Sequence, residues 1–235
     1  MITTMLIVLF VGLILGFPLY VVFSLSGLAA ILGYLDLNTV DVIVQVMRGS
    51  LLKFALMSVP FFIYTAEVMG RGGLAQRLIS WALSIIGFIR GGLAVSLVLA
   101  AGFMGAISGS APATVAALGK ILYPTMVKEK YGEGFTAGLI SSSSALSVVI
   151  PPSITMIILA SLANLSVGAL FIAGLIPALL FMAAFSVYSY LYYTPARAEG
   201  SVYTQKFDVK NILKNTREAI WALGVPVIIL GGIYA

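Results

Sequence analysis

Long apolar runs alternate with short polar breaks along most of this chain. The first run covers residues 2–34 and carries Gly16 and Pro18 near its middle. As one helix it would extend about 50 Å, whereas the hydrocarbon core of a bilayer is about 30 Å thick. We therefore predict two short helices that meet at residues 16–18.

The next two segments differ in how many polar residues they carry. Residues 36–53 hold Asp41, Gln45 and Arg48 among apolar residues at helical spacing, a pattern typical of a helix near the membrane interface. Residues 54–70 are mostly apolar and are predicted to span the membrane.

An amphipathic segment follows at residues 74–89. Its apolar side consists of Leu74, Leu78, Trp81, Ile85 and Phe88, and Arg77 and Ser84 lie outside this side. Short amphipathic helices that contain Trp are common at the membrane interface, so we predict an interfacial arm.

The stretch from Gly102 to Ser153 contains the first of two breaks at residues 108–112. The apolar limbs on either side, residues 93–107 and 113–127, are each about 15 residues long, short of the roughly 20 that a spanning helix needs. Basic residues flank both outer ends: Arg90, Lys128 and Lys130. Two short limbs with outer ends on one side predict a re-entrant helical hairpin over residues 91–129.

The second break, residues 147–153, separates the apolar limbs 135–146 and 154–163. Pro151 and Pro152 have no backbone N–H and disfavour helix in the preceding residue. We therefore predict a broken transmembrane helix over residues 131–163 with unpaired carbonyls before the prolines.

A long helix from residue 167 to 193 should follow, capped by Ser166, after a helix that ends at Asn164. Its end is rich in aromatic residues that suit a membrane interface, namely Tyr188, Tyr190, Tyr192 and Tyr193. Residues 203–217 are predicted to form a cytoplasmic, basic, amphipathic arm. A further transmembrane helix should begin at Ala219.

Composition places these helices in a membrane. Of 235 residues, 61% are hydrophobic and 9% are charged, against roughly 25% charged in soluble domains. The long runs favour an all-α integral membrane protein over a barrel, whose strands alternate apolar and polar residues. The first run lacks a basic start and a cleavage site, so we expect a membrane segment rather than a removable signal.

Charge and missing residue types narrow the function. The net charge of +5 comes from single basic residues between apolar runs, which indicates cytoplasmic loops rather than nucleic-acid binding. Cysteine and histidine are absent, which excludes disulfides, thiolate chemistry and the commonest general base. We do not expect an enzyme.

The two breaks together predict a cation site. Helix carboxyl ends carry partial negative charge, and unwound carbonyls in broken helices bind coupling ions. Carbonyl and hydroxyl oxygens are ligands that suit sodium. The candidate ligands are Ser108, Gly109, Ser110, Ser147, Val149 and Pro152. In the alternative interpretation, the serines only cap helices and the prolines only kink them.

Other polar residues have simpler interpretations. Ser141–Ser144 is expected to support helix packing rather than bind a ligand, and Glu67 to pair with Arg71 at i+4. Lys120 is unusual at this depth and should extend toward the basic side. A Ser–Lys dyad of Ser108 or Ser110 with Lys120 is the enzyme alternative.

The chain resembles the large membrane subunit (M, DctM-like) of tripartite ATP-independent periplasmic (TRAP) transporters over nearly its whole length. The residues that carry the resemblance are Pro60–Ile63, Glu67–Met69, Arg90–Gly92, Ile107–Ser110, Ala116–Gly119, Ile150–Ile154 and Gly168–Phe171. The chain departs from many relatives at Ser147, where they carry Gly, and at residues 112–114, where they carry Val-Ala-Asp.

The resemblance implies a multi-pass bacterial inner-membrane elevator transporter built of two inverted repeats. Such subunits use a sodium gradient to import carboxylate-bearing solutes such as C4-dicarboxylates or sialic acid. They work with a small four-helix membrane subunit (Q) and a periplasmic substrate-binding protein (P). Their sodium ligands map here onto residues 108–110 and 147–152.

The same resemblance divides the chain. Residues 1–90 and 164–235 would belong to the scaffold and its arms, and residues 91–163 to the moving transport domain. We expect the chain to be the first inverted repeat of a longer protein, with the second repeat absent. Two rival hypotheses remain: another ion-coupled elevator symporter for dicarboxylates or divalent anions, and a structural membrane subunit that transports nothing.

Overall fold

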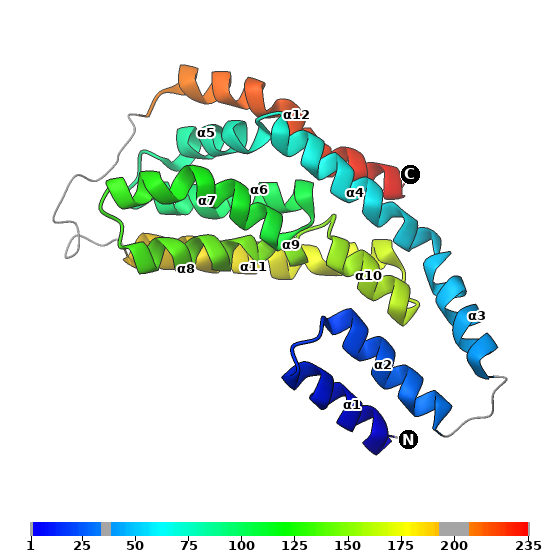
Figure 1. Cartoon of the computed structure of the whole chain (residues 1–235). Coiled ribbons are helices and arrows are strands. Elements are labelled where there is room, and N and C mark those ends of the chain that lie inside the picture. Colours follow the sequence, from blue (N-terminus) through cyan, green and yellow to red (C-terminus); the bar gives the residue numbers. More distant parts are fainter. Residues whose placement is uncertain (1, 34–38, 193–206, 235) are drawn as a thin grey trace. The chain divides into compact units, whose positions relative to one another are not determined.

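The computed structural model describes residues 2–33, 39–192 and 207–234 (Figure 1). Within these ranges the chain forms helices and connecting turns, and no strand. The fold class is therefore all-α, as predicted. The chain divides into two compact units, Met1–Lys53 and Phe54–Ala235, which are described separately.

The first unit begins with a helical hairpin. Helices α1 (Ile2–Ile14) and α2 (Leu19–Leu32) pack side by side, which confirms the predicted break in the first apolar run. Gly16 lies between them with φ +74°, a conformation that favours glycine. Helix α3 (Thr39–Leu51) lies in the segment predicted to be polar and helical.

The second unit is built around one buried helix. Its members are α4 (Phe54–Arg71), α5 (Leu74–Ile86), α6 (Gly92–Ser108), α7 (Ala111–Lys128), α8 (Glu133–Ser144), α9 (Leu146–Val149), α10 (Ile154–Ala163), α11 (Val167–Tyr192) and α12 (Val209–Tyr234). All residues of α6 except Leu99 and Phe103 are buried. A helix that is apolar all round must be covered on every side, and α5, α7, α8 and α11 all pack on α6.

Helix α5 corrects the predicted apolar face. The structure buries Ala75, Leu78, Ile79 and Ala82, whereas the prediction centred the face on Leu74, Leu78 and Trp81. The reason is that α5 packs against two helices, α6 and α12. Small residues face these close contacts, and Trp81 packs edge-on against Phe103 at 4.9 Å between ring centroids.

Helix α12 corrects the predicted boundary at Ala219. The described part of the basic arm and the apolar run form one continuous helix from Val209. Residues 203–206 of the arm, like Tyr193, lie outside the described residues. The polar start and apolar remainder therefore share one rigid element.

Two helix ends agree with the prediction. Asn164 ends α10 with φ +54°, and the amide of Ala169 donates to Ser166 Oγ at 3.3 Å at the start of α11. Among the described residues, α11 and α12 are long and apolar enough to cross a bilayer. Residues Glu133–Val149 and Ile154–Ala163 would form a third span bent by 43°.

Candidate functional site

The hairpin tip is a two-residue turn between α6 and α7. Gly109 ends α6 with φ +59°, and its amide donates to the carbonyl of Gly105 at 2.7 Å. Ser110 is extended, and α7 begins at Ala111 with Pro112 in its first turn. A proline suits this position because the first helical amides have no intrahelical partner.

The second break follows the short helix α9. Ile150 is extended, and the Pro151–Pro152 peptide bond is cis. Ser153 then starts α10: its hydroxyl accepts from the amide of Met156 at 3.4 Å and donates to the carbonyl of Val148 at 2.7 Å. Ser153 thus joins the two sides of the break.

The tip and the break contact each other through their backbones. The amide of Ile154 donates to the carbonyl of Gly109 at 3.3 Å. A β-carbon at Gly109 would lie 3.0 Å from the carbonyl oxygen of Pro152, and one at Gly105 would lie 2.7 Å from the Cα of Ser147. Glycine at both positions therefore allows α6 to approach the break closely.

Thr114 connects the hydroxyl groups of the two breaks. Its Oγ1 lies 3.0 Å from the hydroxyl of Ser108 and accepts from the hydroxyl of Ser147 at 2.9 Å. It also donates to the carbonyl of Ser110 at 3.0 Å. Ser108, Thr114 and Ser147 are almost completely buried, so the cluster lies inside the bundle.

The carbonyl oxygens of Ser110 and Ser147 differ in the number of hydrogen-bond donors near them. The Ser110 oxygen lies within reach of three donors, the Thr114 amide, the Thr114 hydroxyl and the Ser108 hydroxyl. The helical donor for the Ser147 oxygen would be the amide of residue 151, which is a proline and has no N–H. The Ser147 carbonyl is therefore left without its helical partner beside the hydroxyl cluster.

The structure brings five of the six predicted residues together. Ser108, Ser110 and Ser147 meet through Thr114, and Gly109 meets Pro152. The Val149 carbonyl faces α11 instead, because a β-carbon at Gly174 would lie 2.8 Å from its oxygen.

Sequence reasoning missed Thr114 and Ser153. Ser153 could have been found, because serine after a helix-breaking pair is a strong N-cap candidate. Thr114 sits inside an ordinary helical pattern, and its signal was only that residues 112–114 depart from the Val-Ala-Asp of many relatives.

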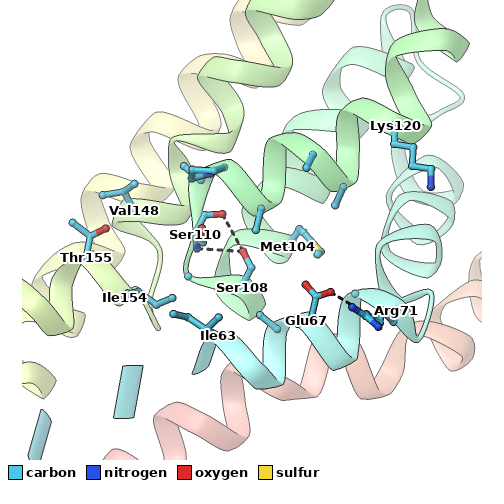
Figure 2. A pocket seen from close by; sticks show the side chains of 18 residues that line it. Ile63, Glu67, Arg71, Met104, Ser108, Ser110, Lys120, Val148, Ile154 and Thr155 are labelled. Atoms are coloured by element: carbon cyan, nitrogen blue, oxygen red, sulfur yellow. Dashed lines mark hydrogen bonds and ion pairs between the residues drawn. The ribbon is translucent and has the colours of Figure 1, made fainter. Parts of the chain in front are cut away.

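A cavity of about 830 Å³ opens beside the tip (Figure 2). It lies between α4 on one side and α6, α7 and α10 on the other. Figure 2 shows Ser108 and Ser110 in the middle of the view, with Val148, Ile154 and Thr155 on one side of them and Arg71 and Lys120 on the other. Glu67 pairs with Arg71 at 2.9 Å between Oε1 and Nε, as predicted.

The remaining serine predictions concern packing and catalysis. Ser143 and Ser144 are fully buried, whereas Ser141 and Ser142 are exposed. For the dyad, the Ser108 hydroxyl is bonded to Thr114 and Ser110. Within the described part of the chain, no hydrogen bond joins Lys120 to either serine. The geometry therefore does not support a Ser–Lys nucleophile.

An apolar helical bundle in which a hairpin tip meets a broken helix is typical of membrane transport proteins. Comparison with protein families gives the same class. Residues 6–235 match the model "Tripartite ATP-independent periplasmic transporter, DctM component", so the chain belongs to the DctM family. This is a family of transporter permeases and not of enzymes.

Individual relatives agree with this assignment. The ectoine/5-hydroxyectoine TRAP transporter large permease protein UehC of Ruegeria pomeroyi is 39% identical across 100% of the chain and 54% of its own length. The C4-dicarboxylate TRAP transporter large permease protein DctM of Vibrio cholerae is 37% identical across 100% of the chain and 51% of its length.

A third relative is the isethionate TRAP transporter permease protein DctMQ of Oleidesulfovibrio alaskensis. It is 38% identical across 94% of the chain and 34% of its own length. The chain thus spans about half the length of the first two relatives.

Proposed function

We propose that the protein to which this chain belongs imports a carboxylate-bearing or similar anionic organic solute, coupled to sodium, across a bacterial inner membrane. The observation that carries the proposal is the buried oxygen cluster at the meeting point of the two breaks. It combines three hydroxyls, on Ser108, Thr114 and Ser147, with the Ser147 carbonyl, whose helical donor is replaced by Pro151.

The chemistry of this cluster favours a monovalent, hard cation. Backbone carbonyls can replace the hydration shell of an alkali ion. Divalent and transition metals in proteins are usually held with carboxylate, imidazole or thiolate ligands. In the described ranges no group of three or more such side chains is gathered. A neutral oxygen cage suits sodium, whose single charge needs no fixed counterion.

The transport movement is proposed to be of the elevator type. Residues 91–163 would move as part of the transport domain, while residues 1–90 and 164–235 would belong to the scaffold and arms. The chain spans about half of its relatives, so a second inverted repeat would complete the substrate site opposite the hairpin tip.

The solute and partners are proposed from the relatives. Their names specify C4-dicarboxylate, ectoine and isethionate transport, which supports the proposal of a small carboxylate-bearing or similar solute. One relative is named as a DctMQ protein. We propose that this protein likewise works with a small Q subunit and with a periplasmic binding protein that delivers the solute.

Uptake into proteoliposomes tests the coupling. The full-length permease, its small subunit and its binding protein are reconstituted, and uptake is measured with an inward gradient of sodium, potassium or choline. The proposal expects uptake with sodium alone. Equal uptake in all three gradients would contradict sodium coupling, and no uptake with any of them, in correctly assembled complexes, would favour the structural subunit.

A further inference from the structure

The cavity beside the tip is a groove between one face of α4 and one face of α7. On α7 it is lined by Ala113, Ala116, Ala117 and Lys120, which follow the i, i+3, i+4, i+7 spacing of a single helix face. Three of these side chains are only methyl groups. The groove exists because small residues leave space between the two helices.

Polarity changes along this groove. At the hairpin tip the lining includes the uncharged Ser108 and Ser110, with Ile154 and Thr155 beyond them (Figure 2). Lys120 lies ten residues along α7 from Ser110, which corresponds to about 15 Å of helix. Arg71 and Glu67 of α4 are the other charged residues of the lining. Figure 2 shows Arg71 and Lys120 on the same side of Ser108, and we call this side the charged end of the groove.

The charges at that end do not balance. Arg71 is already paired with Glu67 at 2.9 Å. Lys120 is exposed and has no ion-pair partner among the residues that the structure describes. Two cations and one carboxylate leave one net positive charge in the groove.

A lone lysine in an apolar helix needs water or a counterion. Ionisable residues within membrane segments usually face a water-filled cavity and mark the path of a substrate or ion. Lys120 has a cavity beside it, and the cavity continues to the hairpin tip. In the described part of the chain, neither the packing nor the hydroxyl cluster supplies a counterion for Lys120.

We propose that the α4–α7 groove is a water-filled approach to the hairpin tip, and that Lys120 with Arg71 binds anionic groups, carboxylate or sulfonate, at its charged end. Arg71 contributes while remaining tied to Glu67, which limits the local charge. Identifying the anion as the transported solute rests on the proposed function. The groove's preference for anions does not.

Thiol labelling tests the preference with defined probes. The chain has no cysteine, so Ala116→Cys introduces one thiol of this chain into the groove wall. The full-length protein, with any other cysteines replaced, is treated with an anionic and a cationic methanethiosulfonate reagent. We expect the ratio of the anionic to the cationic labelling rate to be higher at Ala116→Cys than on a free thiol in solution.

Three charge variants of the Ala116→Cys protein test which side chains set the ratio of the two labelling rates. Lys120→Gln should lower the anionic-to-cationic rate ratio about 1.4-fold to fivefold, the range of an exposed charge interaction. Glu67→Gln should raise the ratio, because it leaves Arg71 unpaired. Lys128→Gln, on the same helix but outside the groove, should leave it unchanged.

Two results would overturn the proposal. If neither reagent labels Ala116→Cys, the groove is closed to water. If Lys120→Gln and Lys128→Gln have equal effects, Lys120 sets no local potential. Labelling needs no sodium gradient, so it tests the groove independently of transport. Sodium-independent uptake would reject the sodium coupling, and the expected labelling ratios would still support the anion-binding groove.

Discussion

The buried hydroxyl cluster and the charged residues of the groove differ in burial and in charge. In the cluster, Ser108, Thr114 and Ser147 are buried and uncharged, and hydrogen bonds hold their oxygens in place. In the groove, Arg71 and Lys120 are exposed and charged. Burial strengthens a neutral dipole, whereas a buried unpaired charge would be costly. Burial therefore favours neutral oxygen groups in the cluster, whereas exposure allows charged side chains in the groove.

The largest effect is expected where the backbones of the tip and the break touch. Gly105→Ala would place a β-carbon 2.7 Å from the Cα of Ser147, and overpacking of this kind costs about 1–3 kcal/mol. We expect a lower unfolding temperature and loss of sodium-dependent uptake. The matched control is Gly119→Ala, which meets no atom within 4 Å. Equal behaviour of the two variants would show that the close approach is not required.

The next effect concerns the hydroxyl that joins the two breaks. Thr114→Val keeps the shape but removes both the donor and the acceptor, and a buried group left unpaired costs about 1–3 kcal/mol. The sodium concentration needed for half-maximal uptake should rise in Thr114→Val, whereas Thr114→Ser should stay close to the wild type. Thr125→Val, which removes a hydroxyl bonded to the Ile121 carbonyl on the same helix, is the control. A similar rise in the sodium requirement of Thr125→Val would contradict a specific role of the Thr114 hydroxyl.

A smaller effect is expected at the cap of α10. Ser153→Ala loses bonds to both Met156 and Val148, and loss of a helix cap costs about 1 kcal/mol. Ser166→Ala removes a single exposed cap bond and should cost less. Thermal unfolding of both variants measures the difference. The opposite order would mean that the break is not held by Ser153.

The smallest effect is expected from salt, which should act on the exposed charges of the groove and not on the buried cluster. The Debye length falls from about 10 Å at 0.1 M to about 3 Å at 1 M ionic strength. Adding choline chloride should therefore weaken the anion preference of Ala116→Cys labelling at the exposed end. The sodium concentration that gives half of the maximal rise in unfolding temperature should change little when the same choline chloride is added. Equal sensitivity of the two measurements to choline chloride would contradict the contrast in burial.

The sequence predicted those elements whose signals are local. Pro151 and Pro152 marked the break, Asn164 and Ser166 marked helix ends, and short limbs around Gly109 marked the hairpin. The apolar face of α5 was misplaced because its burial depends on contacts with α6 and α12, which a single-helix pattern does not contain. Thr114 was missed for a related reason: its role depends on Ser147, which is 33 residues away along the chain.

The most direct test of the account is a sodium titration of thermal stability in the purified full-length permease. A ligand that binds the folded state raises stability with its concentration relative to Kd. At constant ionic strength with choline chloride, we predict that sodium raises the unfolding temperature and that Thr114→Val needs more sodium for the same rise. Identical curves for sodium and choline, or for wild type and variant, would contradict a sodium site at the hairpin tip.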